Sequence, residues 1–220
     1  MPTLPNPHSL IETLEAGGPI MALMLLASVL LVALAMERWI NVLRAGRAVR
    51  RVDEKVLEAA RKGNFEEARR LCDGVGAPAR DVFAAGLDRA LGRVKGQPRM
   101  AMQRETKRAV ATLKAGIWIL GTSGALMPFI GLLGTVLGVM GSFQAIGSAG
   151  TGGFAVVSAG ISEALIATAA GLFVALEAII FFNYLQNAIG GTARELALLV
   201  DELNELLESR EAASAGSSAG

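Results

Sequence analysis

Histidine and cysteine are almost absent from this sequence of 220 residues, which contains one of each, His8 and Cys72. A single cysteine excludes an intramolecular disulfide and a cysteine-rich zinc site. A single histidine argues against a Ser-His-Asp triad and against a histidine-ligated metal centre. Since no pairing of a nucleophile with a base stands out either, we predict a protein that is not an enzyme and that uses no metal or cofactor.

Charged residues are also scarce, and they are strongly segregated. They make up 19% of the chain, against about 25% in soluble domains, while hydrophobic residues reach 52%. Residues 37–114 hold 19 of the 21 Lys and Arg but 10 of the 20 acids, a net charge of +9, whereas residues 194–220 carry −4. The 48 residues between Lys114 and Glu163 include no charge at all. This distribution indicates a membrane protein.

Three apolar segments are long enough to cross a bilayer as helices, which takes about 20 residues. We predict transmembrane helices at 16–36, 115–143 and 154–184, the last two joined by a turn at 144–153 into a helical hairpin. A signal peptide is the alternative for the first segment, but acids precede it where a signal peptide carries Lys or Arg. The predicted fold class is therefore an all-α membrane protein with three spans.

The distribution of Lys and Arg predicts the orientation, because these residues mark the cytoplasmic side. They follow the first span and precede the second, and the hairpin turn has none. The N-terminus (1–15) and the turn are therefore expected outside. The segment 37–114 and the C-terminus are expected inside.

Both expected inside segments have the apolar periodicity of amphipathic helices, and in 80–94 it places Val82, Phe83, Leu87 and Leu91 on one face. The last helix expected in 37–114 begins at Pro98. It is expected to continue without a break into the second span. Residues 185–211 are predicted to form an amphipathic helix, and 212–220 a disordered tail. Nucleic-acid binding is disfavoured, because the basic residues of 37–114 alternate with acids and are accompanied by few aromatics. A solvated helical segment near anionic lipid headgroups is the simpler alternative.

Small residues recur at steps of three or four along both helices of the hairpin and form a stripe on each. Such stripes let helix backbones approach closely. In one interpretation they pack the hairpin against itself; in the other, several copies of the chain surround an axis that the small faces line. Thr135 and Thr168 would then offer hydroxyls to water or a proton, although a buried Thr can also bond the carbonyl one turn back. The small residues assigned to the lining are Gly131, Gly134, Gly138, Ala164 and Gly171.

Two acids lie in or near the third span, Glu163 near its outer end and Glu177 in its inner half. A charge at the centre of a bilayer costs on the order of 2.5–3.5 kcal/mol, so both are candidate functional residues. Glu163 is either a pore carboxylate or an interfacial one. Glu177 projects about 180° from Thr168, and we expect it to face a neighbouring helix or the inner interface. Arg108 and Lys114 are its candidate partners.

Two motifs resemble the TolQ/ExbB branch of the MotA/TolQ/ExbB proton-channel family. They are PFIGLLGTVLGVMGSF at 128–143 and ISEALIATAAGLFVA at 161–175. The sequence ERW after the first span and the three-span plan extend the resemblance over nearly the whole chain, while the flagellar stator branch, with four spans, fits less well. The resemblance implies a homo-oligomeric ring, a pentamer, in the bacterial inner membrane, with its N-terminus in the periplasm and its C-terminus in the cytoplasm.

The resemblance also implies a moving partner. In this family the second and third spans line a central pore around the single-span helices of two copies of an ExbD/TolR-like protein, which carries the titrating Asp. Thr135 and Thr168 match the family's two pore Thr positions, and Glu163 matches its membrane Glu. The ring and its partner form a motor that converts proton flow into motion. Where the family commonly has Pro, this chain has Glu177.

Two other functions stay open at this point: a passive pore or transporter subunit without a moving partner, and a scaffold whose small stripes only pack helices. A neighbouring gene for a one-span protein with an Asp in its span would favour the motor. Whether the ion is a proton or sodium, and whether the output is outer-membrane uptake, envelope constriction or gliding, does not follow from these residues.

Overall fold

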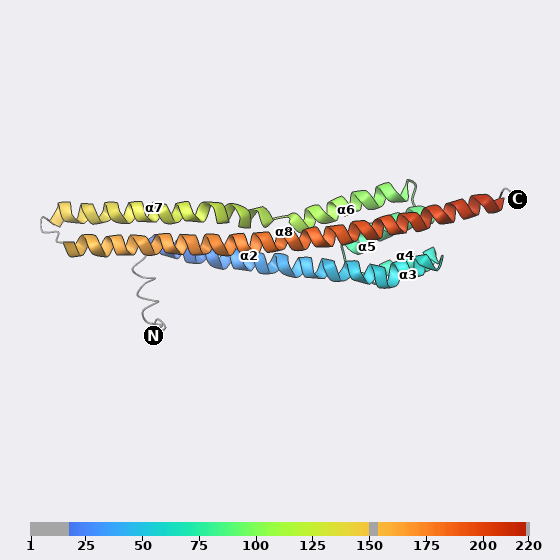
Figure 1. Cartoon of the computed structure of the whole chain (residues 1–220), viewed down its shortest axis with the longest axis horizontal. Helices are drawn as coiled ribbons and strands as arrows, with labels where there is room; N and C mark the ends of the chain where they lie inside the picture. Colours follow the sequence, from blue (N-terminus) through green and yellow to red (C-terminus); the bar gives the residue numbers. More distant parts are fainter. Residues whose placement is uncertain (1–17, 150–153, 219–220) are drawn as a thin grey trace. The chain divides into compact units, whose positions relative to one another are not determined.

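The computed structural model describes residues 18–149 and 154–218, and these residues form helices and no strands (Figure 1). In chain order the elements are α2 (Gly18–Arg51), the π-helix η1 (Val52–Leu57), α3 (Glu58–Arg61), α4 (Phe65–Cys72), α5 (Ala79–Ala90), α6 (Pro98–Lys114), α7 (Ile117–Ala149) and α8 (Phe154–Ser218). The predicted all-α class is confirmed. The predicted outside N-terminus, 1–15, lies outside the described residues.

Three helical segments are long and apolar enough to cross a membrane. They are Pro19–Arg61, Pro98–Gly147 and Val157–Ala213, and each contains one of the apolar runs that the sequence predicts as a span. The predicted number of spans is therefore confirmed within the described part of the chain.

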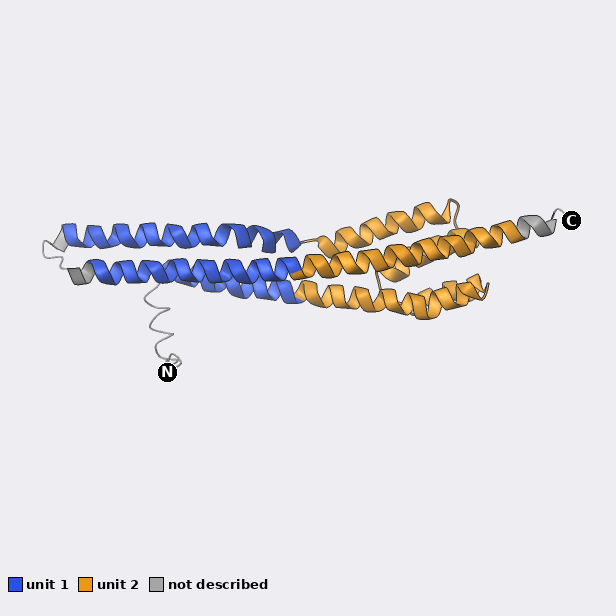
Figure 2. Ribbon diagram, viewed as in Figure 1, with its two compact units in different colours: residues 1–36, 116–183 blue, residues 37–115, 184–220 orange. Residues whose placement is uncertain are grey.

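The chain divides into two compact units (Figure 2). Unit 1 comprises residues 1–36 and 116–183, and unit 2 comprises 37–115 and 184–220. Among the described residues, unit 1 therefore holds α7 and the apolar parts of α2 and α8. Unit 2 holds the charged parts of those two helices together with the short helices between them.

The outward surface of unit 1 is apolar. Leu126 and Phe129 of α7 are 52% and 67% exposed, and Leu172 and Phe173 of α8 are 54% and 66% exposed. Large exposed apolar patches mark an interaction or membrane surface. Here they continue along both hairpin helices, which is the pattern of a surface covered by lipid or by other transmembrane helices.

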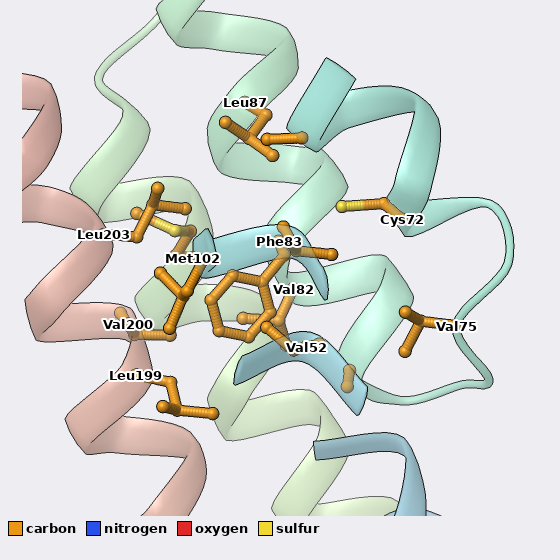
Figure 3. Close-up of a cluster of buried hydrophobic side chains, with 14 of the residues drawn as sticks. Val52, Cys72, Val75, Val82, Phe83, Leu87, Met102, Leu199, Val200 and Leu203 are labelled. Atoms are coloured by element: carbon orange, nitrogen blue, oxygen red, sulfur yellow. The ribbon is translucent and has the colours of Figure 1, made fainter. Parts of the chain in front are cut away.

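Unit 2 has an ordinary hydrophobic core. Phe83 and Leu87 of α5 pack with Met102 of α6 and Leu203 of α8, and all four are completely buried (Figure 3). Phe83 and Leu87 are four residues apart, so they lie one above the other on the same helix face. The apolar periodicity of the sequence predicts this face.

The predicted continuous helix from Pro98 into the second span is wrong. Helix α6 ends at Lys114, and α7 begins at Ile117. Between them Gly116 has φ 76°, a left-handed conformation that glycine adopts without steric cost. Gly116 therefore interrupts the helix between Lys114 and Ile117.

Two other predicted boundaries fall inside longer helices. Helix α7 continues to Ala149, so residues 144–149, predicted as part of the turn, are helical. Helix α8 runs without a break from Phe154 to Ser218. The predicted amphipathic helix is its continuation, and 212–218, predicted as disordered, also belongs to it. Neither stretch contains proline, and extending an existing helix costs far less than nucleating a new one.

Candidate functional site

The α7–α8 hairpin of unit 1 is held by close backbone contact. A Cβ atom on Gly171 would lie 2.7 Å from the carbonyl oxygen of Met127 and 2.9 Å from Cα of Gly131. A Cβ atom on Gly138 would lie 2.8 Å from Cβ of Ala164. Because these separations are shorter than van der Waals contact, only glycine fits without moving the helices apart.

The small residues assigned to a pore lining all belong to this intramolecular contact. Gly131, Gly134, Ala164 and Gly171 are buried, and Gly138 is partly buried. Gly134 also approaches α2, since a Cβ atom there would lie 3.3 Å from Ile20. The geometry supports the interpretation in which the stripes pack the hairpin against itself. A role in lining a pore between copies stays a prediction.

Both candidate pore hydroxyls have partners within the chain. The Oγ1 of Thr168 donates to the carbonyl of Gly131 across the hairpin, at 2.8 Å. The Oγ1 of Thr135 donates to the carbonyl of Leu132 one turn back on its own helix, at 2.7 Å. Thr168 therefore fastens α8 to α7, whereas Thr135 satisfies itself. Self-satisfaction is one of the alternatives that the sequence leaves open.

Glu163 is exposed on α8. It borders a hollow of about 210 Å³ between α2, α7 and α8. The other residues that line this hollow are Pro19, Ile20, Gly134, Leu137, Gly138, Ala164 and Ala167. Unit 1 contains no Lys or Arg, so no side-chain ammonium or guanidinium group of this unit neutralises the carboxylate. Glu163 and Thr168 lie on the same helix five residues apart, which is about 7.5 Å along its axis.

Glu177 faces a neighbouring helix, as the sequence predicts, and its hydrogen-bond partner within unit 1 is a hydroxyl group; pairing with Arg108 or Lys114 of unit 2 stays a prediction. Its Oε2 accepts a hydrogen bond of 2.8 Å from Oγ of Ser28 on α2, while Arg108 pairs with Glu105 in unit 2 at 2.9 Å. Unit 1 itself contains no Lys or Arg. Ser28 is the only polar side chain in 16–36. This isolated hydroxyl in an apolar span could have identified it as a hydrogen-bond partner for a carboxylate.

Replacing Glu177 with Gln is expected to retain both stability and output, because the amide oxygen can still accept the hydrogen bond from Ser28. Removing the donor by Ser28→Ala should lower stability by about 0.5–1.5 kcal/mol. Thermal unfolding of the purified protein in detergent measures both effects. A Glu177→Gln protein that is stable but loses the function that the resemblance implies would contradict this structural role and make Glu177 a functional residue.

These spans and their hairpin define a multi-pass helical membrane protein with hydroxyls and carboxylates inside its apolar unit. The profile described as the MotA/TolQ/ExbB proton channel family matches residues 75–197, more than half of the chain. The chain belongs to this family, as its two motifs predict. The matched region includes both helices of the hairpin up to Ala197 and the second half of the basic segment.

Curated relatives agree with this assignment. The chain is 30% identical to the biopolymer transport protein ExbB of Pseudomonas putida over 152 residues, 66% of this chain and 46% of the relative. It is 37% identical to the Tol-Pal system protein TolQ of Pseudomonas aeruginosa over 127 residues, 58% of this chain and 50% of the relative. It is 43% identical to an ExbB of Xanthomonas campestris over 98 residues, 44% of this chain and 34% of the relative. The chain thus spans half or less of the length of these relatives.

Proposed function

We propose that the chain is the ring-forming channel subunit of a motor in the bacterial inner membrane, driven by the proton-motive force. Several copies, five by resemblance, surround the single-span helices of an ExbD/TolR-like partner, and Thr135, Thr168 and Glu163 lie on the proton pathway. A proton that crosses 100 mV releases about 2.3 kcal/mol. That energy suffices for a conformational step of the partner relative to the ring.

Family membership carries this proposal, because the matched residues 75–197 include the three candidate pathway residues. Two features of unit 1 support it. Glu163 is an exposed carboxylate in a unit without Lys or Arg, so its charge is better accommodated beside water or a partner than against lipid. The exposed apolar faces of α7 and α8 also need a cover, which neighbouring copies and lipid supply.

Purification from native membranes tests the proposal. A mild-detergent extract of the tagged full-length protein should contain a one-span protein with an Asp in its span. Replacing that Asp with Asn should leave the complex intact and stop its output. Recovery of rings without any such protein would favour the passive pore or the scaffold instead.

The proposed orientation predicts which cysteines an impermeant maleimide reaches in intact cells. Gly147→Cys, at the outer end of α7, should be labelled, whereas Gln103→Cys on α6 should be labelled only after lysis. Both positions are exposed, and a Cβ atom at Gly147 meets nothing within 4 Å. The opposite labelling pattern would invert the topology.

The native Cys72 can stay in place during this experiment as an internal control. It is completely buried, and burial raises the pKa of its thiol to about 12. Since the thiolate is the reactive form, Cys72 should react in neither intact nor lysed cells, and only after denaturation. It could not report topology by itself, although it lies in the segment expected inside.

A further inference from the structure

Three arginines line up on one face of α2 within unit 2. Arg44, Arg47 and Arg51 follow the spacing i, i+3, i+7, which keeps them within an arc of about 60° and spreads them over about 10.5 Å of helix. All three are exposed. In the described part of the chain, no ion pair involves any of them.

Several other arginines of unit 2, but not all of them, form ion pairs within the chain. Arg69 pairs with Asp88 at 2.7 Å and with Asp73 at 2.9 Å. Arg61 pairs with Glu202 at 2.7 Å and with Asp53 at 2.9 Å. Unit 2 therefore pairs part of its arginines internally, whereas none of the three stripe arginines has an ion pair among the described residues.

The stripe borders a hollow of about 320 Å³. Its remaining lining residues are all small: Ala48 on α2, and Gly76 and Ala77 on the turn before α5. A Cβ atom on Gly76 would lie 3.7 Å from Cβ of Ala48, so the turn passes close to the helix. The hollow combines three guanidinium groups with no acidic side chain.

A second hollow, of about 330 Å³, adjoins the first and shares Arg44 and Ala77 with it. Its apolar lining residues include Ala45, Pro78, Ala109 and Leu113. Its two acids are already paired with arginines: Asp81 with Arg80, and Glu105 with Arg108. An unpaired cationic groove thus continues into a largely apolar one, an arrangement that suits an amphiphilic anion.

We propose that Arg44, Arg47 and Arg51 bind a phosphate group, either that of an anionic phospholipid or that of a soluble phosphate compound. Guanidinium groups present a planar fork that bonds phosphate bidentately. The adjoining apolar hollow favours the lipid source. So does the stacked pair of Trp39 and Tyr184, with ring centroids 4.1 Å apart, since these aromatics collect at the membrane interface.

The position of Arg44 along α2 is suitable for binding a lipid headgroup. Arg44 lies at the end of the stripe that is nearest to Trp39. Arg44 follows Trp39 by five helical residues, about 7.5 Å along the axis. The polar layer on each side of a bilayer is about 5–7.5 Å thick. Arg47 and Arg51 lie further along the same face and complete the groove. This site is independent of proton flow, so it stands or falls separately from the proposed motor.

Native mass spectrometry of the full-length protein tests the site, using phosphatidylcholine nanodiscs with and without phosphatidylglycerol. Arg51→Gln and Arg47→Gln should each weaken phosphatidylglycerol binding by about 10-fold or more. Arg50→Gln is the matched control, because it removes the same charge from the same helix but does not line the hollow. It should change binding less than about two-fold.

Two further probes, inorganic phosphate and a poly-glutamate peptide, distinguish a phospholipid from the other ligands that the arginines could bind. Phosphate dependence of thermal stability in detergent, abolished by Arg51→Gln but not by Arg50→Gln, would support the site with a soluble ligand. Equal effects of Arg50→Gln and Arg51→Gln would overturn the proposal, because binding would then follow net charge alone. Arginine-dependent binding of a poly-glutamate peptide, with no such binding of phosphatidylglycerol or phosphate, would also overturn it and assign the groove to an acidic protein segment.

Discussion

Replacing Thr168 with Val is expected to abolish the proton-driven output while the protein stays folded and assembled. Val is nearly isosteric with Thr, so the α7–α8 contact keeps its shape. The substitution removes one hydrogen bond, from Oγ1 of Thr168 to the carbonyl of Gly131. Interhelical hydrogen bonds inside membranes are worth about 0.6 kcal/mol on average, which is too little to unfold the hairpin. Loss of output would therefore report a role of the hydroxyl in proton transfer or in motion.

Three variants give this experiment its controls. Thr168→Ser keeps the hydroxyl and should restore output. Thr135→Val is expected to behave like Thr168→Val, although its hydroxyl bonds only its own helix. Thr122→Val changes an exposed Thr of α7 that has no assigned role and should preserve output. Output is measured in cells with the partner present, and assembly by size-exclusion chromatography. Normal output from both Thr135→Val and Thr168→Val would remove the hydroxyls from the pathway.

The sequence predicts the parts of the fold that depend on composition and local periodicity. Three long apolar runs predict three spans, although the third, 154–184, includes Glu163 and Glu177. In unit 2, Phe83 and Leu87 are predicted to share a buried face because their spacing matches the helical period. Both predictions are confirmed, since burial of an apolar stripe is an almost obligatory consequence of its pattern.

The identity of the helix that packs against a given face is not encoded in the local sequence. For such contacts the sequence analysis leaves alternatives open or gives a wrong prediction. The spacing of Gly131 and Gly171 predicts that each lies on a small face, but not that the two faces meet within one chain. The helix break at Gly116 depends on a single residue, whereas other glycines lie within α7 and α8 without ending them. The bond between Ser28 and Glu177 joins residues 149 positions apart, and a search limited to charged partners overlooks it.

Gly171→Ala is expected to destabilise the hairpin. The new Cβ would lie 2.7 Å from the carbonyl oxygen of Met127 and 2.9 Å from Cα of Gly131. Both obstacles are backbone atoms of α7, so no side-chain rotation relieves the clash and the helices must separate. Overpacking of this kind costs about 1–3 kcal/mol. Separation of α7 from α8 would also stretch the bond from Thr168 to Gly131.

Gly141→Ala is the matched control, because it adds the same methyl group to α7 where nothing lies within 4 Å of the new Cβ. Alanine favours the helix over glycine by up to about 1 kcal/mol, so Gly141→Ala should be neutral or stabilising. The two variants are therefore expected to shift the unfolding temperature in detergent in opposite directions. If both variants shifted the unfolding temperature by the same amount, the backbones of α7 and α8 would not be as close at Gly171 as the distances above indicate. A fall in stability at Gly171 alone, together with loss of the assembled species, would establish that close contact within each hairpin is a condition for assembly.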